Sequence, residues 1–570
     1  MNGELFDAGL STLKGRYNRR QFMRVSALTA GSALLVACGG TNENLMASTT
    51  PLPKEGVAPS AVTATAQASV GKTYFPSPAP NVPDAFTAPL PPYQSVTAVP
   101  GMGGTVNVFS ISYVAPETPH AQNKFWQGLE KRLNVKWNLN HAVGGDNYQE
   151  KASAILASGK FPDLFLLLPD LSYALYKAID QGAFNDLTPY LSGAALKEYP
   201  NLARYPDLLW KNAAINGKLY AVPRPFTFAS GMMLYRKDWA KKLGIAEPKS
   251  ADDFYKMMTT FSKSNPEGKQ VWGMGFAADG IFKSSSQFIL NMFRVPSEWR
   301  REANGSMTYF IQTDEYRQAV DFMRRMYAAG LFYPDSLTST GLQMRQAFLA
   351  GKIGSYVDGS TALDAVRFKF QSVNPKADVG ILIPPGADGG KGSYWMGKGY
   401  NGMTAIPSSI SDSNRIKELL RILNYLAAPA FSVEANYISL GVDDWDNKPD
   451  ANGIRALTQT GSKEIGALAN VAFGNRVFYY PSDLQLGPIF QDYTRRLFEI
   501  GVANPTDRVV PPPTAQKKSD TLENLVNDRV LRIVKGVDPL SALDTAIQEW
   551  KSQGGEQMAQ EYAQALAKLP

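Results

Sequence analysis

The feature that most constrains the fold is a continuous apolar run, Leu164-Phe165-Leu166-Leu167-Leu168. Runs of this kind mark strands that are buried on both faces of a parallel sheet. Two alternating apolar and polar segments precede it, at residues 106–111 and 135–141, and a helical pattern follows each of them. The second of these helices ends at Gly159. A strand, helix, strand, helix, strand order predicts a doubly wound α/β lobe.

A second lobe is predicted after Pro223. Residues 232–235 and 271–276 have strand patterns, and Ser250 begins a capping box before an apolar helical stripe. Residues 379–384 and 403–407 are interpreted as crossings back to the first lobe. The predicted organisation is lobe 1 at residues 104–223 and 385–440, lobe 2 at 224–384, and a C-terminal helical region at 441–570 that packs on the lobes.

The N-terminus has the pattern of an exported lipoprotein. A pair of arginines, Arg19 and Arg20, precedes thirteen uncharged residues from 25 to 37, and Cys38 follows. The uncharged segment is too short for a membrane helix, which needs about 20 residues. Residues 1–37 therefore predict a twin-arginine type signal peptide, and Cys38 is the expected lipidation site. The alternative is a short buried helix with a chance cysteine.

Residues 38–103 predict a tether. The segment is rich in Ala, Ser, Thr and Pro, it carries almost no charge, and it has no apolar periodicity. Such a composition is typical of a disordered, partly extended linker. Cys38 is the single cysteine of the chain, so no intramolecular disulfide forms and the core alone must stabilise the exported protein.

Charge and histidine content argue against several functions. The 570-residue chain has a net charge of +7, and residues 1–37 hold five basic and two acidic residues, which leaves +4. This charge is dispersed, so we expect no nucleic-acid partner. Only two histidines occur, His120 and His141, which leaves little room for a triad or a zinc site. We expect no cofactor and no enzyme, although a mechanism based on carboxylates alone stays open.

Several segments together resemble the bacterial extracellular solute-binding proteins of family 1, in their large lipoprotein branch. They are Asp163-Leu164-Phe165, Leu234-Tyr235-Arg236-Lys237-Asp238-Trp239, Ala347-Phe348-Leu349-Ala350-Gly351-Lys352-Ile353-Gly354, and the tail from Lys535 to Gly555. The resemblance implies a type 2 periplasmic-binding-protein architecture, in which two lobes joined by a hinge hold a ligand in their cleft. It also implies a monomer that delivers a carbohydrate to an ABC transporter permease, with a lipid anchor as its membrane attachment.

One departure from the resemblance concerns metal binding. Some large oligosaccharide-binding members carry a calcium loop near the capping-box helix. Here that segment is Asn265-Pro266-Glu267-Gly268-Lys269-Gln270, which has few carboxylates and a lysine among them. Calcium needs six to eight oxygen ligands, so we predict no metal at this loop.

Candidate ligand-binding residues lie at predicted strand ends and crossings. In open α/β sheets ligands bind beyond the carboxyl ends of the strands, and in two-lobed proteins they bind between the lobes. Sugars offer hydroxyl groups to charged side chains and C–H faces to aromatic rings. Side chains of these types occur at Tyr113, Glu117, Asp170, Arg224, Phe226, Asp279, Asp358, Tyr394, Trp395 and Tyr400.

Each of these positions has a structural alternative. Trp395 and Tyr400 could belong to the core, Asp170 could cap a helix, and Arg224 could brace the hinge through a salt bridge. The carboxylates could form an acid and base pair, but their spacing pairs no two of them. The functional alternatives are a surface polysaccharide hydrolase or lyase, and a binding protein for peptides or another solute.

Overall fold

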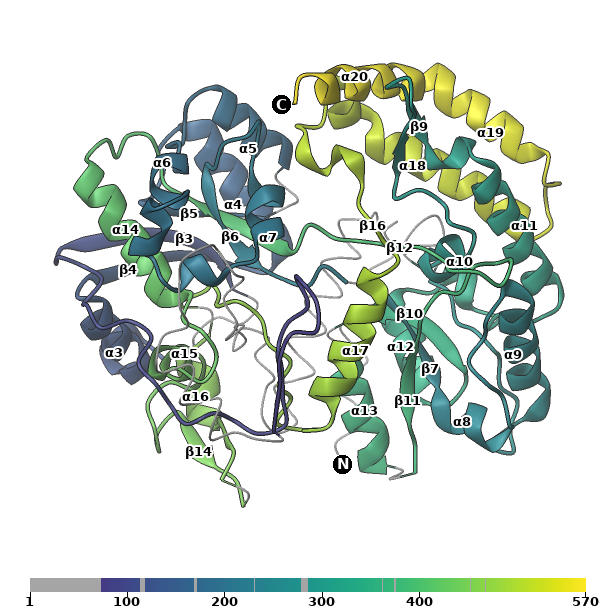
Figure 1. The fold of residues 1–570 in the computed structure, drawn as a ribbon, viewed down its shortest axis with the longest axis horizontal. Helices are drawn as coiled ribbons and strands as arrows, with labels where there is room; N and C mark the ends of the chain where they lie inside the picture. Colours follow the sequence, from purple (N-terminus) through teal and green to yellow (C-terminus); the bar gives the residue numbers. More distant parts are fainter. Residues whose placement is uncertain are drawn as a thin grey trace.

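The structure is a computed structural model that describes residues 73–112, 118–168, 172–229, 231–277, 285–360, 362–373, 376–451, 453–466 and 468–569. Two α/β units, each built around its own sheet, lie side by side in Figure 1. The α/β class predicted from the sequence is confirmed, with sheets that contain antiparallel as well as parallel strand pairs.

A five-stranded sheet in the order β4-β3-β5-β13-β6 forms the centre of the first unit. Its strands are β3 (Thr105–Ser112), β4 (Lys136–Val143), β5 (Leu164–Leu167), β6 (Ala221–Pro225) and β13 (Tyr400–Ala405). β3 runs parallel to β4 and β5, whereas β13 is antiparallel to β5 and β6. The carboxyl ends of β3 to β6 therefore share one edge with the start of β13. We call this the carboxyl edge.

Helices cover this sheet and share one apolar core with it. They are α3 (Lys124–Leu133), α4 (Gly145–Ser158), α5 (Ser172–Asp180), α6 (Thr188–Leu191), α7 (Asp207–Ala213), α14 (Ser413–Leu426), α15 (Val433–Leu440) and α16 (Gln459–Glu464). In α3 the stripe of Phe125, Leu129 and Leu133 is fully buried. The Asn123 side chain caps this helix by accepting the Trp126 N–H at 2.8 Å, which satisfies one of the unpaired donors of the first turn.

A three-stranded sheet in the order β10-β7-β11 forms the centre of the second unit. Its strands are β7 (Gly231–Arg236), β10 (Ser355–Gly359) and β11 (Val379–Leu382), and both outer strands are antiparallel to β7. The accompanying helices are α8 (Lys237–Lys242), α9 (Ala251–Ser264), α10 (Gln287–Met292), α11 (Asp314–Ala328), α12 (Gly341–Leu349) and α13 (Ala362–Val373). The expected cap is present, because the Ser250 hydroxyl accepts the Asp253 N–H at 3.1 Å.

The strand expected at residues 271–276 is instead a row of single bridges to β10 and its neighbours, including Gly275 with Tyr356. The backbone here passes directly against α9. A Cβ on Gly273 would lie 2.5 Å from the Met258 carbonyl oxygen, and the Gly273 N–H donates to the Ser262 hydroxyl at 2.8 Å. The Ser262 hydroxyl therefore accepts the Gly273 N–H that a neighbouring strand would accept in a regular sheet.

The C-terminal helices pack on the second unit. These helices are α17 (Leu486–Phe498), α18 (Pro513–Val534), α19 (Ala542–Trp550) and α20 (Glu556–Ala567). The rings of Trp550 and Tyr309 stack with centroids 4.8 Å apart, and the apolar faces of α18 to α20 share one core with α11. Short strand pairs complete the fold: β8 (Trp299–Arg301) with β9 (Met307–Tyr309), β12 (Tyr394–Trp395) with β16 (Gly501–Val502), and β14 (Asn447–Pro449) with β15 (Arg455–Leu457).

Residues 73–104, which we call the N-terminal arm, differ from the disordered tether expected through residue 103. The arm begins with β1 (Tyr74–Phe75) paired to β2 (Ala85–Phe86). Phe86 is fully buried in a core cluster that also contains residues of β7, β10 and β11. Further along, the Glu434 carboxylate of α15 accepts the Ser95 N–H and hydroxyl, each at 3.0 Å. The arm therefore contacts the cores of both units.

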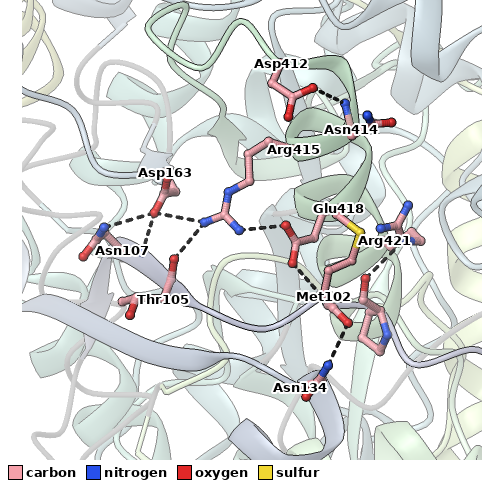
Figure 2. A network of polar contacts seen from close by, with 12 residues as sticks. Met102, Thr105, Asn107, Asn134, Asp163, Asp412, Asn414, Arg415, Glu418 and Arg421 are labelled. Atoms are coloured by element: carbon pink, nitrogen blue, oxygen red, sulfur yellow. Dashed lines mark hydrogen bonds and ion pairs between the residues drawn. The ribbon is translucent and has the colours of Figure 1, made fainter.

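A polar network fixes the end of the arm to the first unit, as Figure 2 shows. The buried Glu418 of α14 accepts the Met102 N–H at 2.7 Å and pairs with Arg415 at 2.8 Å. Arg415 also donates to the Thr105 carbonyl at 2.8 Å and lies 3.5 Å from Asp163. This network lies where β3 begins, and so at the opposite end of the strand from the carboxyl edge.

Candidate functional site

The carboxyl edge brings together three of the residues predicted from the sequence, Arg224, Phe226 and Tyr400. Arg224 lies in β6 and Phe226 directly follows it, while Tyr400 begins β13 opposite the last residue of β6. The Arg224 Nε donates to the Asn401 carbonyl and the Phe226 N–H donates to the Gly399 carbonyl, each at 2.7 Å. Strand pairing thus fixes the backbone of all three residues at one place.

Arg224 is 2% exposed and bonds to uncharged oxygens. Its Nη1 donates to the backbone carbonyl of Asn470 at 3.2 Å and to the side-chain Oδ1 of the same residue at 2.9 Å. The Asn470 amide in turn donates to the Ile111 carbonyl of β3 at 3.0 Å. Arg224 therefore ties the segment at Asn470 to the carboxyl edge.

The same C-terminal segment supplies further side chains that the sequence reasoning missed. The Arg476 guanidinium lies 5.2 Å from the centre of the Phe226 ring, and the Arg224 guanidinium lies 4.7 Å from that of Phe473. Guanidinium groups over aromatic faces are held by cation–π attraction. No local pattern marks this segment, because its contacts with Arg224 and Phe226 are with residues more than 200 positions earlier.

Asp358 is engaged within the second unit. It lies in β10 at the edge where β7 begins. Both Asp358 oxygens accept from Arg345 of α12 at 2.8 Å, and they also accept the Tyr356 hydroxyl at 2.6 Å and the Gly359 N–H at 2.7 Å. Four donors thus fill the acceptor positions of this carboxylate. In this arrangement Asp358 fixes the position of Arg345.

Tyr394 and Trp395 lie on β12, between the two units (Figure 1). The Tyr394 hydroxyl donates to the Gly231 carbonyl at 2.7 Å and accepts the Gly231 N–H at 3.1 Å. The Trp395 indole donates to the Val295 carbonyl at 2.7 Å, and its ring packs against Phe310 with centroids 6.1 Å apart. Tyr394 is buried and Trp395 is partly exposed.

Five sequence-predicted residues lie outside the described part of the chain. They are Tyr113, Glu117, Asp170, Asp279 and the lipidation site Cys38. For these residues the roles given in the sequence analysis stay predictions.

A polar cluster beside the carboxyl edge contains Lys398, which the sequence reasoning also missed. Its Nζ lies 3.7 Å from the carboxylate of Asp507, and its carbonyl accepts the Asn212 amide at 3.0 Å. Asp507 lies in the 3₁₀ helix η10 (Pro505–Arg508), which contacts α7 of the first unit and β8 of the second. The signal in the sequence was a lysine with glycines on either side, Gly397 and Gly399, within the Gly-rich run.

Tyr400 stays a neutral hydrogen-bonding group in this cluster. Burial raises the pKa of Tyr400 to about 12, although the Lys398 charge opposes this rise. Its hydroxyl donates to the Asn212 carbonyl at 3.4 Å. The arrangement offers an ammonium group and a phenol side by side at the end of a sheet.

The loop at residues 265–270 is contacted by two cationic side chains of the protein, Arg236 and Lys242. Glu267 pairs with Arg236 at 2.7 Å and accepts the Trp239 indole N–H at 3.1 Å, while the Lys242 ammonium donates to the Pro266 carbonyl at 2.5 Å. Within the part of the chain that the structure describes, no cluster of three or more His, Cys, Asp or Glu side chains could hold a metal ion. Over the same residues, no helix is both long and apolar enough to cross a membrane.

Comparison with known proteins identifies the family. The family described as bacterial extracellular solute-binding protein matches residues 114–431, more than half of the chain. The chain belongs to this family. As a solute-binding protein of ABC transport it is a non-catalytic protein, which excludes the hydrolase and lyase alternatives.

Relatives and solved structures agree with this assignment. The chain is 25% identical to lipoprotein LipO of Bacillus subtilis over 82% of this chain and 93% of LipO. It is 24% identical to the polygalacturonan/rhamnogalacturonan-binding protein YtcQ of the same organism, over 77% and 87% of the two chains. The fold matches an HMO-binding, ABC-transporter-associated solute-binding protein from Bifidobacterium longum infantis, with a TM-score of 0.60, 17% identity, and coverage of 82% and 99%.

Proposed function

We propose that this solute-binding protein captures an oligosaccharide between its two α/β units and delivers it to an ABC transporter permease. The observation that carries the proposal is the gathering of Phe226 and Tyr400 at the carboxyl edge, where the buried Arg224 holds the backbone in place. Phenol and aromatic groups are those that bind sugar hydroxyls and C–H faces. The relatives YtcQ and the HMO-binding protein, whose names specify saccharides, support the same class of ligand.

Two segments that cross between the units supply the hinge of this proposal. The chain leaves the five-stranded sheet after β6 and enters β7 a few residues later, and it returns between β11 and β13. Tyr394 on the return crossing bonds both backbone groups of Gly231 at the start of β7. Rotation about such crossings closes two-lobed binding proteins on a ligand, and the closed state is stabilised by its higher affinity.

A ligand panel tests the proposal. We expect a mono- or oligosaccharide to raise the melting temperature of the purified protein and to change its tryptophan fluorescence, because ligand binds the folded state alone. The saccharide should be recovered chemically intact after incubation. A response to peptides alone would keep the fold and replace the ligand class. A cleaved product would contradict the non-catalytic role.

We further propose that export removes residues 1–37 and that Cys38 carries the lipid. The basic and apolar segments before Cys38 support this localisation, as does the name of the relative lipoprotein LipO. We expect mass spectrometry of membrane-extracted protein to find an acylated N-terminal peptide that begins at Cys38. The Cys38→Ser variant should be recovered in the soluble fraction. Membrane retention of that variant would show that another segment is the anchor.

A further inference from the structure

Lys398 is held at a fixed position next to the carboxyl edge. The Gly399 carbonyl accepts the Phe226 N–H at 2.7 Å, and the Gly397 N–H donates to the Phe228 carbonyl at 2.7 Å. The Lys398 carbonyl itself accepts the Asn212 amide at 3.0 Å. Backbone bonds on both sides of the residue therefore determine where its side chain starts, while the side chain stays 32% exposed.

The ammonium of Lys398 keeps its charge at this position. Burial acts to lower the pKa of Lys398, but the surrounding Tyr400, Tyr176, Asp507 and Glu298 outweigh it and raise the pKa above its ordinary value. A charge that is partly removed from water attracts an anion more strongly than one on an open surface. The phenols of Tyr400 and Tyr176 are polar neighbours of the same cluster.

The ion pair between Lys398 and Asp507 is too weak for Lys398 to serve mainly to stabilise the fold. The Lys398 to Asp507 distance is 3.7 Å, and the two side chains are 32% and 23% exposed. Partly exposed pairs at such distances contribute little to stability. The pair therefore leaves the ammonium able to exchange Asp507 for a closer, ligand-borne anion.

We infer that Lys398 binds a carboxylate group of the captured saccharide, so that the ligand is an acidic oligosaccharide of the uronate class. This inference rests on the proposed saccharide-binding function and specifies its ligand by charge. The neighbouring Tyr400 and Asn212 belong to the same hydrogen-bonded cluster. Arg476 over the Phe226 ring places a second cation at the carboxyl edge. A ligand carboxylate that bonds the ammonium directly makes a shorter, charge-assisted hydrogen bond in place of the 3.7 Å pair with Asp507, which a neutral sugar cannot do.

The test compares trisaccharides that differ in charge. Trigalacturonic acid, trimannuronic acid, fully methyl-esterified trigalacturonic acid and maltotriose are titrated by calorimetry into the purified protein and into its Lys398→Met and Lys398→Arg variants. We expect an acidic trimer to bind, its esterified or neutral counterpart to bind at least tenfold more weakly, and Lys398→Met to weaken acidic binding at least tenfold. Lys398→Arg, which keeps the charge, should retain most of the affinity. Raising the salt concentration should weaken the same interaction.

The controls separate this inference from the proposed function. Lys263→Met removes one exposed lysine from the end of α9 and should leave acidic binding unchanged. Melting temperatures of the ligand-free variants show whether each is folded. Acidic trimers that bind no more tightly than maltotriose, or that bind wild type and Lys398→Met with equal affinity, would overturn the acidic-ligand inference and leave the saccharide-binding function standing. If no saccharide in this set or in the wider panel bound, the proposed function itself would be contradicted.

Discussion

The Arg236→Met variant is expected to unfold with a free energy lowered by about 3–5 kcal/mol, because two carboxylates lose their buried cation. Arg236 is 2% exposed at the end of β7. Its guanidinium pairs in a bidentate manner with Asp238 at 2.8 and 2.7 Å and contacts Glu267 at 2.7 Å. It also lies between the Trp239 and Phe370 rings, 4.4 and 4.9 Å from their centres. Urea denaturation measures the change.

Two matched variants define the contribution of the planar guanidinium. Arg236→Lys keeps the charge but loses the two parallel hydrogen bonds that the guanidinium makes to Asp238, so we expect an intermediate loss of stability. Lys237→Met removes the adjacent cation, which is 54% exposed and lies 3.9 Å from Asp378. Such an exposed pair contributes about 0–1 kcal/mol. Equal losses from Arg236→Met and Lys237→Met would contradict a special role for the buried arginine.

The same site predicts a pH dependence. Burial acts to raise the pKa of Glu267, but the charge and hydrogen bonds of Arg236 and the Trp239 indole outweigh it, so the pKa lies below its ordinary value of 4.5. The pair therefore stabilises the fold above pH 4.5, and this contribution is lost as the pH falls through the lowered pKa. The stability difference between wild type and Arg236→Met should shrink below pH 4.5. A difference that grows on acidification would contradict this sign.

The Phe86→Ala variant is expected to lose about 3–5 kcal/mol of the free energy that holds the N-terminal arm, because a fully buried ring leaves a cavity. The Phe86 ring lies 5.1 Å from the centres of both Tyr74 and Phe431. Its backbone N–H donates to the Phe478 carbonyl at 2.8 Å. Limited proteolysis measures the effect, since a released arm is cleaved within residues 73–100 under conditions that leave the wild-type arm intact.

Val99 provides the control within the same arm. Its side chain is 61% exposed, so Val99→Ala should change stability by less than about 0.5 kcal/mol. A second variant tests the surface that receives the arm. A Cβ on Gly487 would lie 2.6 Å from the Phe478 carbonyl and 2.9 Å from that of Phe86, so Gly487→Ala should also release the arm. An arm that stays protected in both Phe86→Ala and Gly487→Ala would contradict its docking at this surface.

Local patterns predicted the elements whose signals are contained within a few residues. The apolar run at 164–168 contains β5, and the Ser250 side chain caps α9, whose stripe of Phe254, Met257 and Phe261 is buried. The N-terminal arm was expected to be disordered because composition alone describes it as a Pro- and Ser-rich linker. Its order comes from Phe86, which docks against Phe478 far along the chain, and no local window contains that contact.

The candidate site was predictable to the extent that strand ends determine it. Arg224 and Tyr400 come together because β6 and β13 pair, and the end of a strand is visible in a sequence. Asp358 also lies near a strand end, yet its oxygens are taken by Arg345, whose position depends on how α12 packs against β10. Lys398 escaped notice for a related reason, since its partner Asp507 is supplied by a segment more than 100 residues away.

The docking of the N-terminal arm also sets an order of events during biosynthesis. The Gln491 amide donates to the Phe75 and Pro83 carbonyls, contacts that span 416 and 408 residues of chain. Contacts of such sequence separation form late, because closing so long a loop costs chain entropy before the contact forms. Residues 73–90 are synthesised early. Their aromatic side chains stay unburied until α17 has been synthesised. The first described segment to be made is therefore among the last to fold, and it exposes an apolar surface that a chaperone can hold in the meantime.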